Sequence, residues 1–510
     1  MFAKKIKDRM ANLTTDYINK FNALYNPSKL SCCSCNPKTG FSGGVFQWIH
    51  DHPTTTKVMQ IAGLILGCAA LISAPFSLPV LGVAFTASVG VIGGLFLLSS
   101  LATWLCLKYV TCAKHDMKQH VYQEIQYGQS RLYYRGDIPV LEMDGTSEEC
   151  GQVHGYLLGP QICALKNNLD LALHGIMRLP CPDRLQKVLD AVYETIPESL
   201  QQEMQGLVNG YNEWAQKAKK SSMTIGDALL MHLIADSKHF HPKQVEKSLL
   251  QMPEDQAAAC TVLLDRDQEG RVLFGRNMDW CPFGKGGSYS LVFVWKQKGV
   301  AALGVPGLIG AVTGWNRDKL SLAINVCPGD TQTVRGMPAI LYNRYILENA
   351  KTVARVKELI RAQRPLGPYH MSVADAQNHG ACISFYQDRC GGDHIRDLEE
   401  SPIQVLNWNY PACEEGYFHS QIRCRILTGY YNTARRWEIQ KNTVLDRRAL
   451  IANALTLSPY INTWITMHSL IMEPVRGQVQ MSWDNGFAAS QPNPANVPMT
   501  EFFEPSPRTN

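Results

Sequence analysis

The chain has 510 residues, a formal net charge of +5 and 18% charged residues. This length accommodates two or three domains or one large one. The near-balanced charge, without a basic stripe interleaved with aromatic residues, argues against nucleic acid as a partner. The sixteen cysteines follow no spacing framework, which argues against a disulfide scaffold.

Residues 1–57 form a polar, basic N-terminal segment with eight Lys/Arg against three Asp. Cys32, Cys33 and Cys35 make up its cysteine cluster, and no second Cys or His pair follows at zinc spacing. We therefore expect no metal site and no cofactor, with lipidation of these cysteines as an alternative. The start lacks the prompt apolar run of an ordinary signal peptide.

Residues 58–107 contain no Asp, Glu, Lys or Arg, and these 50 positions are enough for two membrane crossings of about 20 residues each. Pro75 and Pro79 interrupt the run near its middle, where a turn would lie. The alternative is a buried core helix. A hairpin leaves both lysine-bearing flanks on one side, which predicts a cytosolic catalytic domain. We expect a multi-pass membrane protein with a two-helix transmembrane hairpin, and a membrane as its partner.

This two-lobed apolar segment resembles the chlamydial inclusion membrane proteins in shape, not in motif. The resemblance implies a bacterial protein inserted in a host-derived membrane.

After a polar linker at 108–137, residues 138–145 predict a strand and a turn. Apolar residues then recur at three- and four-residue spacing, which predicts a helical part over 138–259. The helices are expected from about residue 150 and over about 185–192, 197–211 and 224–240. The polar stretch 251–259 suits an exposed loop.

Residues 258–280 predict a β-hairpin. Thr261–Leu264 and Val272–Phe274 are apolar or β-branched, and residues 267–270 supply turn chemistry. Cys260 stands at the head of the first strand. Arg276 and Asp279 close the second strand, so the hairpin can set a guanidinium and a carboxylate beside the thiol.

A cysteine that attacks a carbonyl needs a base or a positive neighbour to favour its thiolate. A distant histidine is one solution, as in papain-like enzymes. Another is cleavage just before Cys260, which makes the new α-amino group, with a pKa of roughly 7.7–8, a base near working pH. Asp279 would orient this amine and Arg276 would favour the thiolate. The alternative is a buried cysteine in an ordinary hairpin.

The order Cys260, Thr261, turn and Gly275–Asp279 resembles the mature N-terminus of acid ceramidase and N-acylethanolamine acid amidase. It is also similar to bile salt hydrolases and penicillin acyltransferases, which are N-terminal-nucleophile hydrolases, and the similarity continues to about Trp483. It implies an α+β fold, a four-layer αββα sandwich, with self-cleavage between Ala259 and Cys260. Residues 138–259 would then be a pro-part that remains as an associated subunit.

Beyond Cys260 the sequence alternates strands and helices, which suggests two packed sheets covered by helices. Strands are expected over 289–295, 301–303, 320–324, 371–375, 381–386, 403–406 and 478–483, and helices over 337–363, 422–437 and 450–457. We expect a catalytic part over 260–500 and a polar tail over 501–510.

The same resemblance assigns the rest of the catalytic site. Asn325 would be an oxyanion donor, and Val326 follows it where acid ceramidase has Glu. Asn409 would be the second amide of the site, with Asn407 as the fallback. Ser420-x-x-Arg423 matches the segment that supplies a further arginine, with Arg425 as its competitor.

Residues outside these motifs complete the hypothesis. Trp280 and Phe283 would bind substrate, or belong to the core. Cys150–Gly155 is similar to the Gly-x-x-His-Gly segment that begins the penicillin acyltransferase pro-part, and His154 is interpreted as a packing or capping histidine.

The leading function is a self-processing cysteine amidohydrolase that cleaves a ceramide-like, lipid-like N-acyl amide through a thioester on Cys260. The alternatives are an acyltransferase, a membrane-anchored interaction protein or effector with an inactive hydrolase fold, and a His-assisted cysteine protease.

Overall fold

The protein is seen here as a computed structural model. It describes residues 120–170, 189–233, 236, 258–280, 286–327, 336–385, 394–399, 402–407, 420–457, 460–463 and 465–504. The expected N-terminal segment, the cluster Cys32/Cys33/Cys35 and the predicted hairpin at 58–107 lie outside the described residues.

The larger sheet, sheet A, has ten strands in the order β1-β2-β3-β6-β7-β8-β9-β10-β11-β12. Neighbours run antiparallel except β3 and β6, which are parallel. Its strands are β1 (Ile125–Tyr127), β2 (Ser130–Arg135), β3 (Ile138–Met143), β6 (Leu291–Trp295), β7 (Val300–Gly304), β8 (Thr313–Asn316), β9 (Ser321–Val326), β10 (Tyr369–Ala374), β11 (Gly380–Ser384) and β12 (His394–Asp397).

The smaller sheet, sheet B, has six antiparallel strands in the order β13-β4-β5-β14-β15-β16. These strands are β4 (Ala258–Arg266), β5 (Val272–Trp280), β13 (Ile403–Val405), β14 (Thr466–Glu473), β15 (Gln478–Trp483) and β16 (Ala495–Pro498). The hairpin predicted from the sequence forms as β4–β5, the second and third strands of this sheet.

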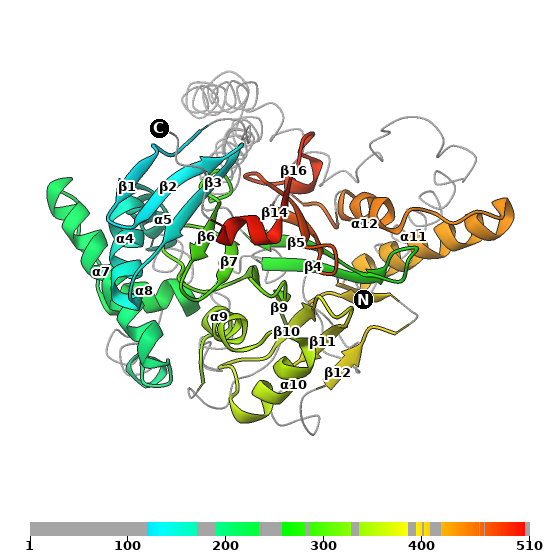
Figure 1. Ribbon diagram of the computed structural model, residues 1–510, viewed down its shortest axis with the longest axis horizontal. Helices are drawn as coiled ribbons and strands as arrows, with labels where there is room; N and C mark the ends of the chain where they lie inside the picture. Colours follow the sequence, from blue (N-terminus) through cyan, green and yellow to red (C-terminus); the bar gives the residue numbers. More distant parts are fainter. Residues whose placement is uncertain are drawn as a thin grey trace, which may run out of the picture.

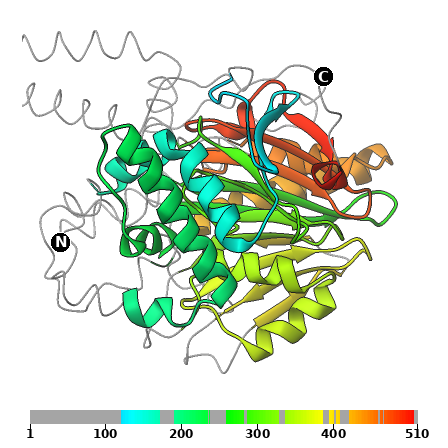
Figure 2. The same cartoon turned by 60° about the vertical axis from the view of Figure 1, so that its left-hand side comes forward.

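Helices cover the outer face of each sheet (Figures 1 and 2). Sheet A carries α4 (Ser147–Leu157), α5 (Gly159–Asp170), α7 (Glu198–Lys217), α8 (Ile225–His232), α9 (Ala339–Asn349) and α10 (Val353–Ala362). Sheet B carries α11 (Ser420–Lys441) and α12 (Arg447–Leu455). Two short 3-10 helices, η5 (Ala488–Ser490) and η6 (Met499–Phe503), lie near the C-terminal end of the described chain.

Three apolar cores separate these layers. Because successive strand side chains point to opposite faces, Phe293 of β6 packs toward the helices and Val294 packs toward sheet B. In β5, Phe274 lies between the sheets and Leu273 faces α12. The result is a helix–sheet–sheet–helix sandwich, the layering that the family resemblance implies.

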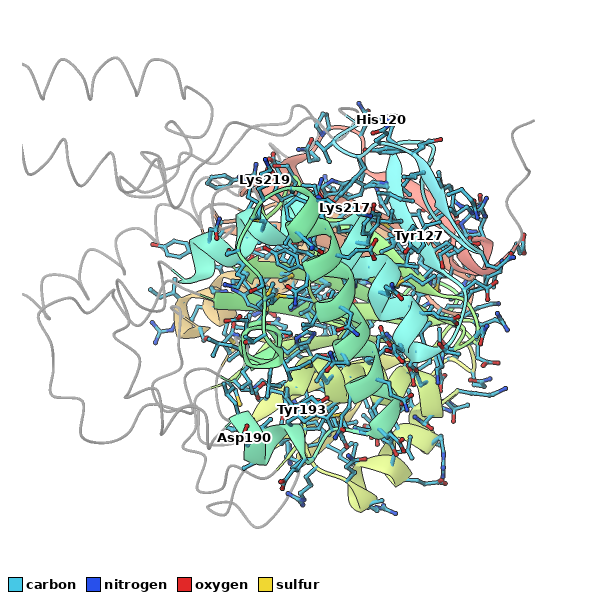
Figure 3. The ribbon with its side chains drawn as sticks, turned by 90° about the vertical axis from the view of Figure 1, so that its left-hand side faces the viewer. His120, Tyr127, Asp190, Tyr193, Lys217 and Lys219 are labelled. Carbon is cyan, nitrogen blue, oxygen red and sulfur yellow. The ribbon has the colours of Figure 1, made fainter. Side chains whose placement is uncertain are left out.

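The two helices α4 and α7 cross with their backbones almost in contact, and Figure 3 shows α7 running across this face with Lys217 near one end. A Cβ atom on Gly151 would lie 1.9 Å from the carbonyl oxygen of Glu203, and one on Gly206 would lie 2.0 Å from that of Glu148. Glycine is therefore required at this crossing, because any side chain would push the helices apart.

The part of the chain before Cys260 is built into the sandwich. Its strand β3 pairs with β6, so β1–β3 extend a sheet whose other strands follow Cys260. Glu203 of α7 is buried, accepts a hydrogen bond from Trp295 Nε1 and pairs with Arg344 at 3.5 Å. Burial raises the pKa of Glu203 to about 7, against the opposing effect of Arg344.

The structure differs from several predicted boundaries. β1 and β2 occupy residues 125–135, inside the predicted linker, whereas β3 is the strand predicted over 138–145. The predicted helix 337–363 is two helices, because Thr352 caps a new one by accepting from Arg355 N. Phe502 and Phe503, assigned to a polar tail, are buried between the sheets.

The predicted multi-pass membrane localisation is contradicted. Within the part of the chain that the structure describes, every helix is too short or too polar to cross a bilayer.

Candidate active site

The hairpin that carries Cys260 forms with the predicted turn. Gly270 adopts a left-handed φ of 76°, and Asp267 Oδ1 accepts from the backbone N–H groups of Glu269 and Arg271. The register places Cys260 opposite Met278, and Ala259 opposite Asp279. These two pairs lie at the open end of the hairpin, where β4 begins and β5 ends.

Side chains hold both backbone groups of Cys260. Its N–H donates to Asn407 Oδ1 at 2.8 Å, and its carbonyl oxygen accepts from Arg423 Nη2. The neighbouring strand β13 pairs with β4 only as far as Val405. The Asn407 amide therefore takes the place that a backbone partner would have beside Cys260.

Arg423 is positioned by α11 and is almost completely buried. Besides the Cys260 carbonyl, it donates to Thr261 Oγ1 and, at 3.1 Å, to Asn407 Oδ1. Burial lowers its pKa, and Asp279 acts in the opposite direction. The competing Arg425 is exposed on the same helix, so the structure brings Arg423, and not Arg425, to Cys260.

Arg276 faces the other sheet from the middle of β5. Its Nη1 donates to Asn325 Oδ1 at 3.1 Å, and its Nε donates to Thr313 Oγ1 at 3.4 Å. The side chain is fully buried, and Nη2 has no hydrogen-bond partner among the described residues. One donor of the guanidinium is thus left for another group on the inner face of sheet B.

Asp279 points to the opposite face of β5. Thr466 Oγ1 donates to its Oδ1 at 2.6 Å, and Arg423 Nη2 lies 4.0 Å from its Oδ2. Burial raises the pKa of Asp279, and Arg423, Thr466 and Arg276 oppose this shift. Oδ2 accepts no hydrogen bond from any described residue, so an acceptor remains beside the peptide between Ala259 and Cys260.

Asn325 bridges the two sheets. Its Oδ1 accepts from Arg276 and its Nδ2 donates to the Val405 carbonyl at 3.0 Å. Asn407 makes a similar bridge, with Nδ2 donating to the Val326 carbonyl at 2.6 Å. A primary amide has two N–H donors, so each asparagine has a second Nδ2 hydrogen besides the one in this bond.

The structure thus brings together five of the predicted catalytic residues, Cys260, Arg276, Asp279, Asn325 and Arg423, and adds the fallback Asn407. The preferred Asn409 and the predicted substrate residue Phe283 lie outside the described residues. Trp280 ends β5 half-buried and packs against the core between sheet A and its helices.

Sequence reasoning assigned no role to four polar residues that are buried around the site: Thr261, Thr313, Thr466 and His468. Thr261 directly follows Cys260 in the matched motif, and this position was the one sequence feature that could have indicated its place in the site. Thr466 and His468 lie on β14, a strand that the sequence pattern did not reveal.

His154 has a packing role, as interpreted from the sequence. Its Nε2 accepts from the backbone N–H of Gly307 at 2.9 Å, and His232 Nε2 accepts in the same way from Ile309 at 2.9 Å. Burial lowers the pKa of His154 to about 3 and that of His232 to about 4, so both imidazoles are neutral acceptors. The two histidines fix the segment between β7 and β8.

No group of three or more His, Cys, Asp or Glu side chains suited to a metal ion occurs in the described ranges. The chemistry that the arrangement offers is nucleophilic: a thiol, a guanidinium and a carboxylate on neighbouring strands, and two amides with a spare donor.

Comparison with known proteins gives a partial match. The family described as "Acyl-coenzyme A:6-aminopenicillanic acid acyl-transferase" matches residues 266–395. No curated protein sequence matches the chain.

The solved structures that are similar to the chain include the following two. One is the Caenorhabditis elegans N-acylethanolamine-hydrolyzing acid amidase ortholog, with 17% identity, 42% of this chain and 93% of that chain covered, and a TM-score of 0.34. The other is a mutant of the conjugated bile acid hydrolase from Clostridium perfringens, with 12% identity, 48% of this chain and 94% of that chain covered, and a TM-score of 0.33.

Proposed function

We propose that the protein is an amide hydrolase or acyltransferase that cuts its own chain before Cys260 and then uses this cysteine as an N-terminal nucleophile. The observation that carries the proposal is how Cys260 is held: Asn407 accepts from its N–H and Arg423 donates to its carbonyl. These contacts hold the residue independently of the peptide bond before it. They would keep the thiol in place after that bond is broken.

The proposed self-cleavage starts from the position of the Cys260 thiol next to the peptide bond that precedes it. The Cys260 thiolate adds to the carbonyl carbon of Ala259, the C–N bond breaks, and the nitrogen takes a proton to become the α-amine. Water then hydrolyses the thioester, which leaves a carboxylate on residues 1–259 and a free thiol on residues 260–510.

In the processed enzyme the new α-amine would be the base. Asn407 Oδ1, which accepts from this nitrogen in the intact chain, would keep it in place. The orphan Oδ2 of Asp279, on the residue opposite Ala259, is the second acceptor available to it. Arg276 would favour the thiolate, and the spare amide hydrogens of Asn325 and Asn407, with Asn409 as the alternative, would bind the oxyanion.

The family match supports the class of reaction, and the substrate is proposed from the sequence. The run Arg276-Asn277-Met278-Asp279 followed by an aromatic residue is most similar to the ceramide and N-acylethanolamine amidases. We therefore propose a long-chain N-acyl amide, ceramide-like first, whose amine leaves after protonation by the α-amine. A thioester accepts any nucleophile that enters, so transfer to a second amine is the alternative outcome.

The test begins with a denaturing gel of the purified full chain. We expect two bands, the smaller with the N-terminal sequence Cys-Thr-Val, and a single band for C260A. The processed enzyme then receives a ceramide, an N-acylethanolamine, a conjugated bile salt and a short N-acyl amino acid, with and without an added amine. An intact chain that turns over substrate would refute the self-cleavage. Preference for the short amide would refute only the lipid assignment.

A further inference from the structure

His468 of β14 is a second polar residue on the same face of sheet B as Cys260. The pairing of β4, β5 and β14 places Cys260, Met278 and His468 in one row across sheet B. Neighbouring strands are about 4.8 Å apart, so the outer two residues are about 10 Å apart. All three face sheet A, because Val262 and Leu470, two positions along β4 and β14, belong to the core between the sheets.

Arg276 lies on β5, the strand between those that carry Cys260 and His468. Its cross-strand partners are Val262 on one side and Leu470 on the other, so it is the diagonal neighbour of both Cys260 and His468. Diagonal neighbours on one face have Cα atoms about 7–8 Å apart, within reach of long side chains. Arg276 also acts electrostatically on His468, which places the two charged or polar groups near each other.

Each of these two side chains keeps one unused polar atom. Arg276 Nη2 and His468 Nδ1 are buried, and neither has a hydrogen-bond partner among the described residues. A buried polar atom without a partner is destabilising and calls for an occupant or a functional reason. Two such atoms on diagonal neighbours beside a nucleophile point to a shared occupant.

The other ring nitrogen of His468 suggests the chemistry of this occupant. Nε2 lies 2.6 Å from Ser290 Oγ, whose hydroxyl can donate to the Gly286 carbonyl at 3.3 Å. Because the Ser290 hydroxyl donates to Gly286 in this arrangement, its oxygen accepts from Nε2–H of His468. Nδ1 then carries no hydrogen and is an acceptor. Burial, reinforced by Arg276, lowers the pKa of His468 to about 3, so the ring is neutral at working pH.

We propose that Arg276 Nη2 and His468 Nδ1 bind one hydroxyl group beside the scissile carbonyl, which makes His468 a specificity-determining residue. Only a group that accepts from the guanidinium and donates to the imidazole satisfies both atoms, and a hydroxyl or a water does so. The hydroxyl belongs either to the substrate, on a carbon near the carbonyl, or to the water that hydrolyses the thioester. This inference rests on the proposed thioester chemistry.

The experiment uses the full chain with three substitutions and a control. H468F removes both ring nitrogens, H468N keeps a polar atom near the place of Nδ1, and S290A removes the partner of Nε2. H379F changes an exposed histidine and should behave as the wild type. Self-cleavage into two bands, followed on a gel, reports that the fold and Cys260 are intact in each variant.

Two assays separate the sources of the hydroxyl. The first compares kcat/KM for an N-acyl amide with a 2-hydroxyl on the acyl chain and for its 2-deoxy counterpart. The second measures the ratio of hydrolysis to aminolysis with an added amine. A substrate hydroxyl predicts that H468F loses a preference of about tenfold or more. A bound water predicts a fall of similar size in the hydrolysis ratio. H468N should recover part of either effect.

Failure of this inference is distinct from failure of the proposed function. If H468F and S290A are processed and leave both ratios unchanged, the hydroxyl site is wrong while the thioester mechanism stands. If H468F does not fold, S290A and H468N decide. A crystal structure of C260A gives a readout without activity: an ordered oxygen between the two nitrogens supports the site, and their direct contact or an apolar filling refutes it.

Discussion

Replacement of Asn407 by alanine tests the centre of the site. The side chain makes three buried hydrogen bonds: from the Cys260 N–H at 2.8 Å, from Arg423 at 3.1 Å, and to the Val326 carbonyl at 2.6 Å. Losing them at about 1 kcal/mol each should lower the free energy of unfolding by ~3 kcal/mol. Self-cleavage should slow by ~10²–10³ if the amide also stabilises the oxyanion.

The assay follows conversion of the intact chain into two fragments on a denaturing gel, beside a urea melt of the unprocessed protein. N407D separates the two roles, since it keeps the acceptor for the Cys260 N–H but has no Nδ2 donor. N349A is a matched control, because Asn349 is exposed and bonds only within its own helix. If N407A is processed at the wild-type rate while N409A is not, our assignment of the second amide to Asn407 is refuted.

Four further outcomes are expected. R423A should slow self-cleavage strongly, and R425A, on an exposed position of the same helix, should not; equal rates would contradict the role of Arg423. The pKa of His232 falls from 6.5 to about 4 on folding, so its stabilising effect is present above pH 6.5 and is lost as the pH falls toward 4. Between pH 6.5 and pH 4, the free energy of unfolding of H232Q, measured by urea melts, should therefore fall by ~3 kcal/mol less than that of the wild type. G151A should abolish folding or greatly lower Tm, because its Cβ would lie 1.9 Å from a carbonyl oxygen of α7. G429A, in open space on α11, should raise the free energy of unfolding by about 0.5–1 kcal/mol, and a loss there would contradict the packing.

The local part of the site could be predicted from the sequence. Cys260, Arg276 and Asp279 lie on one hairpin, and the turn residues together with two apolar runs fix that hairpin within 23 residues. Strand β14 could not be predicted. Both of its faces are buried, so its sequence shows no alternation of polar and apolar residues, and Thr466 and His468 stayed hidden with it.

The choice between Asn407 and Asn409 shows a second limit of prediction from the sequence. In a predicted strand, residues two positions apart have side chains on the same face, so matching the motif gives no physical reason to prefer one asparagine. The end of the β13–β4 pairing at Val405 supplies that reason for Asn407. The layering of the two sheets likewise came from the family resemblance and not from periodicity.

The parallel pairing of β3 with β6 has a consequence for refolding. The residues before Cys260 supply three strands of sheet A and the buried partner of Trp295 and Arg344, and in the intact chain the peptide bond before Cys260 joins them to the rest. Once that link is cut, unfolding becomes dissociation into two polypeptides. The apparent Tm of the processed enzyme should then rise with protein concentration, and recovery after denaturation should become bimolecular, while the unprocessed C260A chain refolds at a rate independent of dilution.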